Sequence, residues 1–368
     1  SVLDRIRHMS FLMRPSRFAA NLMTFGAEDV FQAAAADYIS IDKLSATKAI
    51  AAYKDASGNG RCVILTVDGL SISAGDPVTF TTSATKDIDV VALSATKALV
   101  VYTGADGFAR VVSISGTTPS YGTAFSFTSN EIWAVAGSSL TSSTVIVGYT
   151  DKTDSESFKA VVLSCPSTTV TAGSIVQLDA GATGGDVGCV ALTSTLAMCF
   201  YKDEGNGSKA TATAMTISGT SITNGTPVVV DTDGNGTKCC ITPLTATKVV
   251  VAYNRGGDCR ARVLTVSGST TVSAGAKLSY ETGTPAGQKL ARVNDTTVVA
   301  MASTSNVGNT YVFSISGTTV SSSDAIEYND GASVSKGDLI MLSATVGTIA
   351  YTDGGNSNHG TSIAFELS

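Results

Sequence analysis

The chain has 368 residues, of which only 15% are charged, and it carries 36 glycines and a formal net charge of −6. This amino-acid composition, with Ser and Thr between short apolar runs, is typical of an all-β protein with tight turns and argues against a helical or disordered chain. The acidic balance argues against a general nucleic-acid-binding protein, which needs a basic face. No run of 18 apolar residues occurs, so we expect no membrane span.

Residues 1–20 differ in composition from everything that follows. Leu3, Ile6 and Met13 fall near helical spacing, and Pro15 ends any helix. We interpret this segment as an arm, and three roles are open for it: packing on its own domain, docking the domain onto a larger partner, or lying on a membrane surface, for which it is short. The residues expected to make partner contacts are Leu3, Ile6, Arg7, Met13 and Arg14.

From residue 21 onward the chain repeats one pattern, which is clearest at Leu93–Tyr102 (LSATKALVVY). Its copies start 49, 47, 52, 52, 49 and 49 residues apart, at Leu44, Leu93, Leu140, Leu192, Leu244, Val293 and Leu342. Seven units of this size without a helical pattern predict an all-β fold, a seven-bladed β-propeller of four-stranded blades. We therefore divide the chain into the arm, residues 1–20, and the propeller, residues 21–368.

One unit illustrates the strands that we expect in each blade. Asp87–Leu93 forms an inner strand, which is largely apolar because neighbouring blades cover both of its faces. Ala98–Tyr102 forms the second strand and Phe108–Ile114 the third. An outer strand then ends at Phe125–Phe127, and outer strands restart at Gly75–Val78 and Gly225–Val228, where Pro suits an edge strand.

The two ends of the chain predict how the blades join. Phe31 stands thirteen residues before the first repeat, as Phe80 does before the second, and Gly26 matches Gly75 in the same way. Gly26–Phe31 is therefore expected to be an outer strand that precedes its own first blade, whereas the last unit ends after three strands. We predict that the N-terminal strand completes the last blade and closes the ring, which removes exposed sheet edges.

The seven cysteines show no repeating spacing. Cys189 and Cys199 fall where the next unit has Ile241 and Val251, so we expect them to be small apolar core residues. The adjacent pair Cys239–Cys240 has no His ligands nearby, which argues against a zinc site. The N-terminus lacks an apolar signal core, so we expect synthesis in a reducing cytosol without a disulfide framework, and no cofactor.

Propeller geometry divides the connections into two sets. The variable loops after the second and outer strands share one side, here called the loop face, and the short turns share the opposite side, the turn face. Recognition usually falls on variable loops held by a rigid scaffold. The motif Tyr-x-Asp recurs in these loops, and two interpretations are open: Asp starts an Asx-type turn while Tyr fills space between blades, or the carboxylates form a ring for a cation or sugar. The candidate binding residues are Asp55, Asp106, Asp151, Asp203 and Asp353.

Metal and catalytic motifs are incomplete. Asp231–Gly236 matches the first half of an EF-hand-type calcium loop, but Thr242 stands where the bidentate Glu belongs, so a Gly/Asn-rich turn is favoured. The two histidines, His8 and His359, have no Ser or Cys companion in a motif, and no pair of carboxylates is singled out. We predict that the protein is not an enzyme and holds no metal.

The phrase LSATKALVVY, followed by a glycine-rich turn and by the Ser115–Thr118 turn, resembles repeats of tail-associated and other structural proteins of tailed bacteriophages. The resemblance covers nearly all of the chain after residue 20. It implies a virion component in multiple copies, made in the host cytoplasm, docked to other virion proteins through residues 1–20 and contacting host surface glycan. No binding residue carries over from it. The alternative is a soluble lectin-like propeller that binds carbohydrate, and a third hypothesis is an enzyme acting on polysaccharide.

Overall fold

A computed structural model describes residues 22–181, 183–304, 307–329 and 333–368. Within these ranges the chain forms strands and two single 3₁₀ turns, η1 (Glu204–Asn206) and η2 (Gly354–Asn356), and contains no α-helix. Neither of these short helical turns could cross a bilayer. The predicted arm lies outside the described residues. Units 1 to 7 denote the seven sequence repeats in chain order.

Units 2 to 6 each form an antiparallel sheet of five strands. Unit 2 contains β6 (Ile88–Ser94), β7 (Lys97–Thr103), β8 (Gly107–Ser115), β9 (Thr118–Tyr121) and β10 (Phe125–Thr128). Unit 3 contains β11 (Ile132–Thr141), β12 (Thr144–Asp151), β13 (Ser157–Ser164), β14 (Thr171–Ala172) and β15 (Val176–Asp179). Unit 4 contains β16 (Thr183–Thr193), β17 (Leu196–Asp203), β18 (Lys209–Ser218), β19 (Ser221–Asn224) and β20 (Val228–Val229). Unit 5 contains β21 (Gly236–Thr245), β22 (Lys248–Arg255), β23 (Asp258–Ser267), β24 (Thr271–Ala274) and β25 (Leu278–Thr282). Unit 6 contains β26 (Gln288–Asn294), β27 (Thr297–Thr304), β28 (Val307–Ser316), β29 (Thr319–Ser322) and β30 (Ile326–Asn329).

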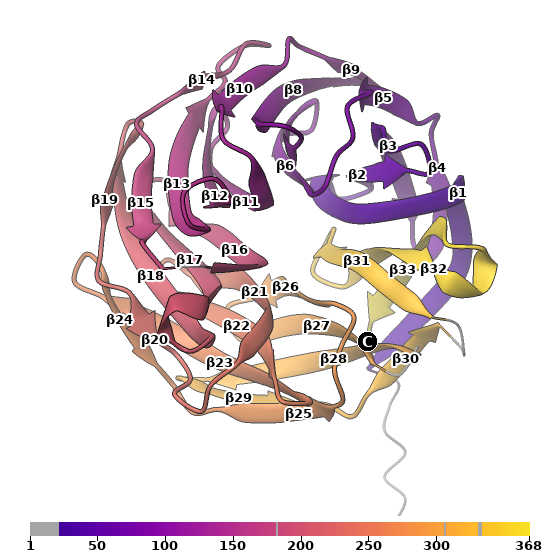
Figure 1. The fold of residues 1–368 in the computed structure, drawn as a ribbon. Coiled ribbons are helices and arrows are strands. Elements are labelled where there is room, and N and C mark those ends of the chain that lie inside the picture. Colours follow the sequence, from indigo (N-terminus) through magenta and orange to yellow (C-terminus); the bar gives the residue numbers. More distant parts are fainter. Residues whose placement is uncertain (1–21, 182, 305–306, 330–332) are drawn as a thin grey trace, which may run out of the picture.

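Units 7 and 1 share one eight-stranded sheet. Its strands are β31 (Val334–Met341), β32 (Val346–Asp353), β33 (His359–Leu367), β1 (Met23–Ser45), β2 (Lys48–Asp55), β3 (Gly60–Asp68), β4 (Ser71–Ala74) and β5 (Val78–Thr81). The long strand β1 pairs with β33 from Met23 to Ala35 and with β2 from Ala36 to Ser45. Figure 1 shows the sheets arranged around a centre, with β1 beside the last strands of the chain. The predicted pairing of the N-terminal strand with the last unit is confirmed.

The outer strand of each of units 1 to 6 is divided in two, and in units 1 and 4 the second segment begins at Val78 and Val228, as the predicted restarts at Gly75 and Gly225 indicate. In unit 2 it is split into β9 and β10, and both segments pair with β8. The break falls at Gly122, whose N–H donates to the Val111 carbonyl at 2.9 Å. A Cβ at Gly122 would stand 2.1 Å from the Thr168 carbonyl oxygen of unit 3. The chain therefore bends where it meets the neighbouring unit, and the bend interrupts the strand.

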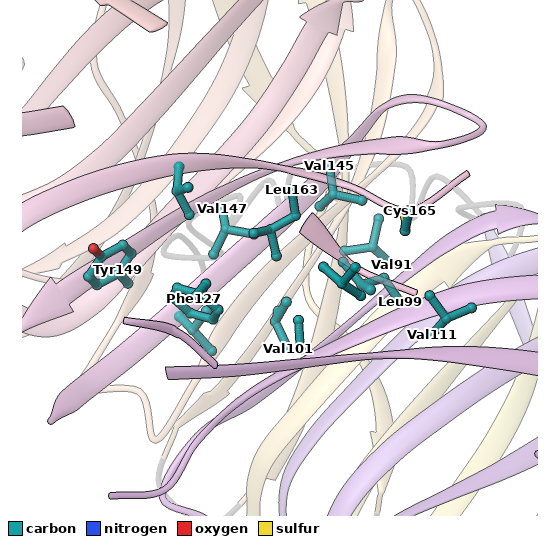
Figure 2. Packing of buried hydrophobic residues seen from close by; sticks show 14 of the residues in the cluster. Val91, Leu99, Val101, Val111, Phe127, Val145, Val147, Tyr149, Leu163 and Cys165 are labelled. Atoms are coloured by element: carbon teal, nitrogen blue, oxygen red, sulfur yellow. The ribbon is translucent and has the colours of Figure 1, made fainter. Parts of the chain in front are cut away.

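The core lies between the sheets. One cluster combines Val91, Leu99 and Val101 of unit 2 with Val147 and Leu163 of unit 3, as Figure 2 shows. Both faces of the second and third strands are covered in this way, so these strands are almost continuously apolar. Burying each such side chain contributes about 1.5–3 kcal/mol, so the stability of a unit depends on its neighbours.

The repeated lysine of the LSATK turn joins units on the turn face. Lys48 Nζ donates to the Gly116 carbonyl of unit 2 at 2.8 Å, and Lys248 Nζ donates to the Gly317 carbonyl of unit 6 at 2.8 Å. Lys97 makes the same contact with the Cys165 carbonyl. The lysine recurs in the sequence because each one reaches the next unit.

All seven cysteines are buried thiols, and none of them forms a disulfide bond. Cys189 and Cys199 face each other across β16 and β17 and are 3% and 0% exposed, so the prediction that they serve as core residues is confirmed. Burial raises the pKa of the Cys62 thiol to about 12, and the pKa values of the Cys240 and Cys259 thiols likewise rise to about 12. These thiols are consequently inert in the native fold.

Candidate functional site

The repeated tyrosines connect neighbouring units. The Tyr201 hydroxyl donates to Asp179 Oδ2 at 2.8 Å, and the acceptor lies on the outer strand of the preceding unit. Tyr53 donates to Gln32 Oε1 at 2.8 Å, and its ring packs edge-on against Phe31 with centroids 5.2 Å apart. Tyrosine therefore fills the space between units and also fastens them, as the first interpretation of the motif predicts.

The aspartates of Tyr-x-Asp mainly hold their own loops. Asp55 Oδ1 accepts the N–H groups of Ser57 and Asn59, both at 2.9 Å. Asp203 accepts the Asn206 N–H at 2.9 Å, and Asp353 accepts the N–H groups of Gly355 and Asn356. These are Asx-type turns, in which a carboxylate replaces a backbone acceptor, so the structural interpretation holds for them.

The five candidate aspartates lie on five different units and do not converge. Asp106 accepts a bond from Ser126 Oγ at 3.3 Å. Burial, with a smaller effect of Asp179, raises the pKa of Asp203. Burial also opposes ionisation of Asp151, but bonds from Asn130 and Lys159 outweigh it and lower its pKa. Within the described ranges, no three His, Cys, Asp or Glu side chains gather in a way that could hold a metal ion.

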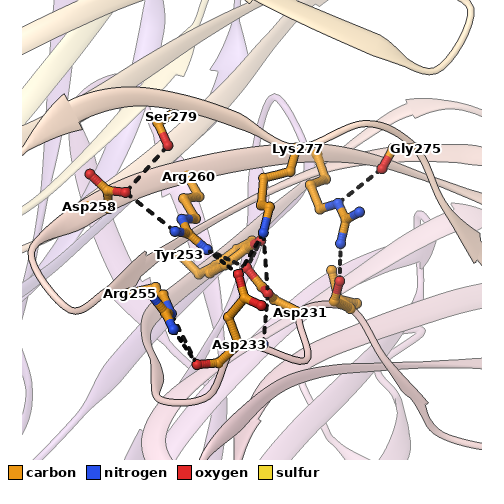
Figure 3. Close-up of polar contacts among 11 residues, drawn as sticks. Asp231, Asp233, Tyr253, Arg255, Asp258, Arg260, Gly275, Lys277 and Ser279 are labelled. Atoms are coloured by element: carbon orange, nitrogen blue, oxygen red, sulfur yellow. Dashed lines mark hydrogen bonds and ion pairs between the residues drawn. The ribbon is translucent and has the colours of Figure 1, made fainter.

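The half-matched calcium loop is occupied by protein cations. Arg260 Nη1 lies 2.8 Å from Asp231 Oδ2, and Lys277 Nζ lies 2.7 Å from Asp233 Oδ2. Arg260 also pairs with Asp258, and Tyr253 donates to Asp231 at 2.9 Å (Figure 3). These carboxylates already have cationic partners, so the ion pairs of this loop hold units 4 and 5 together.

A cavity of about 630 Å³ lies at the centre of the ring and is lined by the inner strands. Its carboxylates bind backbone N–H groups of the next unit: Asp42 Oδ2 accepts from Ala92 at 2.7 Å, and Asp89 Oδ2 accepts from Gly137 at 2.6 Å. Burial raises the pKa of Asp42 to about 7, and burial likewise raises the pKa of Asp87 to about 7. Sequence reasoning missed this group, although polar residues inside an expected apolar strand were a visible signal.

The most prominent exposed aromatic side chain lies on the loop face, where units 2 and 3 meet. Trp133, the single tryptophan of the chain, is 39% exposed, although the adjacent Ile132 and Ala134 on β11 are buried. Lys152 Nζ lies 5.4 Å from the centre of the indole and 2.9 Å from Glu131 Oε2. Lys86 approaches the same carboxylate from unit 2. Bonds from Lys86 and Lys152 lower the pKa of Glu131.

This group, here called the Trp133 site, is held rigidly from both sides. The Glu131 carbonyl accepts a hydrogen bond from the Lys152 N–H at 2.9 Å. This bond joins the residue before β11 to the loop after β12. Asp151, one of the predicted residues, anchors that loop through Thr153 and Asp154 N–H groups, both at 3.1 Å. The site offers a partly exposed ring, with the Lys152 ammonium over it and the Glu131 carboxylate beside that ammonium, which is suited to a ligand with an apolar face and several hydroxyls.

Comparison with solved structures agrees with the ring of sheets. A lectin from Burkholderia pseudomallei superposes with a TM-score of 0.70 at 8% identity, covering 92% of this chain and 97% of the lectin. The WD40 domain of Toxoplasma gondii coronin gives 0.63 at 10% identity, covering 94% and 86%. A Dyadobacter fermentans protein of unknown function gives 0.54 at 13% identity, covering 95% and 100%. The fold is that of a β-propeller.

At these identities the likeness extends to the propeller fold alone. No family model matches the chain, and no curated protein matches it either. The function must therefore be argued from the propeller's own residues. The predicted docking residues Leu3, Ile6, Arg7, Met13 and Arg14 lie outside the described part of the propeller chain.

Proposed function

We propose that the protein is a non-enzymatic propeller that binds saccharide on its loop face, with the Trp133 site as its contact. The observation that supports this proposal is the partly exposed indole of Trp133, with the Lys152 ammonium over its ring and Glu131 bound by both Lys152 and Lys86. Tryptophan combines a large apolar ring with an indole N–H, and such side chains are enriched at binding interfaces.

The single tryptophan provides a direct assay. Emission from Trp133 should shift to shorter wavelength and saturate when a saccharide covers the ring. Trp133→Ala should abolish binding on a glycan array, whereas Ile175→Ala, which removes an equally exposed apolar side chain (42%), should leave it unchanged. Unaltered emission and equal array signals for the two variants would refute the proposal.

We further infer seven blades. The eight-stranded sheet divides at Ala35/Ala36, where β1 changes partner, and the five remaining sheets contribute one blade each. On this count β1 closes the ring by completing the last blade. A truncation that removes residues 1–35 should then expose β33 and cause aggregation.

A second candidate function concerns the turn face. Leu22 and Ser368 lie together, since Ser368 N–H donates to the Leu22 carbonyl at 3.3 Å, and β33 ends on the turn face. Leu22, the first described residue, therefore lies on the face opposite the Trp133 site. This arrangement supports the proposal that the arm docks the propeller into a larger assembly, such as a phage virion, while the loop face contacts the host. Removing residues 1–20 should abolish co-sedimentation with DNA-filled particles and leave saccharide binding intact.

A further inference from the structure

Asp151 has the largest set of partners among the five candidate aspartates. In three other loops the carboxylate binds N–H groups of its own loop, as at Asp55, Asp203 and Asp353. Asp151 does the same through Oδ1, and its Oδ2 also accepts a hydrogen bond from Asn130 Nδ2 at 2.7 Å. Lys159 Nζ lies 2.9 Å from the same Oδ2. The carboxylate of unit 3 is thus bound by groups from outside its own loop as well.

The Asp151 carboxylate is buried, and both of its oxygens are engaged. The side chain is 1% exposed. Oδ1 accepts the Thr153 and Asp154 N–H groups, and Oδ2 faces the Asn130 amide and the Lys159 ammonium. Lys159, whose side chain is 14% exposed, also lies 2.7 Å from Asp154 Oδ2. A ligand on the loop face does not reach this carboxylate, so Asp151 can serve a binding site only through its neighbours.

The two chain segments that Asp151 joins are those that carry the Trp133 site. Asn130 precedes Glu131 at the entry to β11, and Lys152 follows directly after β12. The Glu131 N–H donates to Thr153 Oγ1 at 3.2 Å, and the Glu131 carbonyl accepts the Lys152 N–H at 2.9 Å. The Lys152 ammonium lies 2.9 Å from Glu131 Oε2 and 5.4 Å from the centre of the indole. Both distances depend on how the two segments are joined.

Unit 4 shows the same loop without these partners. Asp203 stands where unit 3 has Asp151, and Thr211 stands where unit 3 has Lys159. Burial raises the pKa of Asp203, whereas the bonds to Asp151 outweigh its burial and lower its pKa. The Asx-type turn therefore forms without an amide or ammonium partner, so turn formation alone does not account for Asn130 and Lys159 at Asp151.

We propose that Asp151 is a positioning residue of the Trp133 site. It fastens the segment before β11 to the loop after β12, and this holds the Lys152 ammonium beside Glu131 and over the indole. The inference rests on the proposed saccharide binding, and it assigns Asp151 an indirect part in it instead of the direct contact that the sequence predicts. Trp133 and Lys152 supply the contact surface, and Asp151 sets the distance between them.

The test compares Asp151→Ala with Asp203→Ala, which removes the equivalent aspartate from unit 4. The probe is the saccharide that gives the strongest array signal with the unmodified chain, and Trp133 emission reports its binding. Asp151→Ala should weaken affinity about tenfold or more, the usual effect of losing bonds to a charged group, and Asp203→Ala should leave affinity unchanged. Asn130→Ala keeps the turn and removes one bond to the carboxylate, so it should weaken affinity about threefold even if Asp151→Ala unfolds the chain.

A double-mutant cycle with Lys152→Met separates positioning from a general loss of structure. If Asp151 acts by placing the Lys152 ammonium, Asp151→Ala should change affinity little in the Lys152→Met background. Without ligand, Asp151→Ala should change Trp133 emission and its quenching by acrylamide in the same direction as Lys152→Met does. Additive effects on affinity, or unchanged affinity in Asp151→Ala and Asn130→Ala, would overturn the inference. If the unmodified chain binds no array saccharide, the proposed function fails, and the ligand-free emission still decides whether Asp151 positions Lys152.

Discussion

Replacing Gly26 by alanine tests whether the two chain ends are packed as described. A Cβ at Gly26 would stand 1.9 Å from the Leu70 carbonyl oxygen and 2.8 Å from its carbon, whereas ordinary contact begins at 3.4 Å. The outer part of β1 would have to retreat from unit 1 by about 1.5 Å, against the pairing of Phe25 with Phe365. We expect a loss of about 3 kcal/mol in the free energy of unfolding, since backbone atoms cannot rotate out of the way.

Two matched variants divide this effect into its causes. Gly69→Ala meets no atom within 4 Å but has φ of +57°, so it should cost about 1 kcal/mol from backbone conformation alone. Gly287→Ala has open space and no positive φ, so it should be neutral or slightly stabilising. Urea unfolding followed by circular dichroism measures all three. If Gly26→Ala unfolds at the same urea concentration as Gly287→Ala, the packing of β1 on unit 1 is not as described.

Three further predictions follow from buried charges and thiols. The raised pKa values of Asp42 and Asp87, both about 7, mean that the folded state holds protons that the unfolded chain releases. The contribution of these two carboxyls to stability is therefore full below about pH 4 and is lost as pH rises through 7. The fall should reach at most about 1.4 kcal/mol per pH unit for each carboxyl, and Asp42→Asn should flatten the urea midpoint measured between pH 5 and 8. Arg260→Met should cost about 3 kcal/mol in the same assay because the buried Asp231 carboxylate, whose side chain is 3% exposed, loses its cationic partner at 2.8 Å and keeps Lys277 at 3.8 Å. Arg292→Met, whose pair with Asp295 is exposed, should cost less than about 1 kcal/mol. All seven thiols should resist a thiol reagent in native buffer and react after unfolding, and rapid native labelling would contradict their burial.

Much of the fold is readable from the sequence because the same contacts recur in every unit. The match of Gly26 with Gly75 predicts the position of the N-terminal strand, and both glycines do lie against a turn of the next unit, at Leu70 and Thr117. The tyrosine recurs in six of the seven units because its ring fills the space between neighbouring units; unit 6 has Ala302 in its place. A residue that recurs at the same place in each unit therefore indicates a recurring contact, even when the atoms that it touches are not known.

The candidate sites could not be predicted in the same way, because they lie where the units differ. Trp133 occurs once, and nothing in its local sequence marks it as exposed. The aspartates of Tyr-x-Asp attracted attention because they repeat, and repetition here reflects turn formation. A residue that serves one ligand has no reason to recur in every unit.

The repeat, the all-β class, the partner of the first strand and the apolar role of Cys189 and Cys199 are all predictable from the sequence, since each depends on local spacing or on equivalence between units. Which side chains from different units meet is visible only in the folded protein: Lys54 of β2 and Lys336 of β31 at Asp37, Lys86 at Glu131, and Arg260 at Asp231. These pairs are separated by tens to hundreds of residues along the chain. Their meeting depends on the angle and register at which neighbouring sheets pack, which no spacing within one unit encodes.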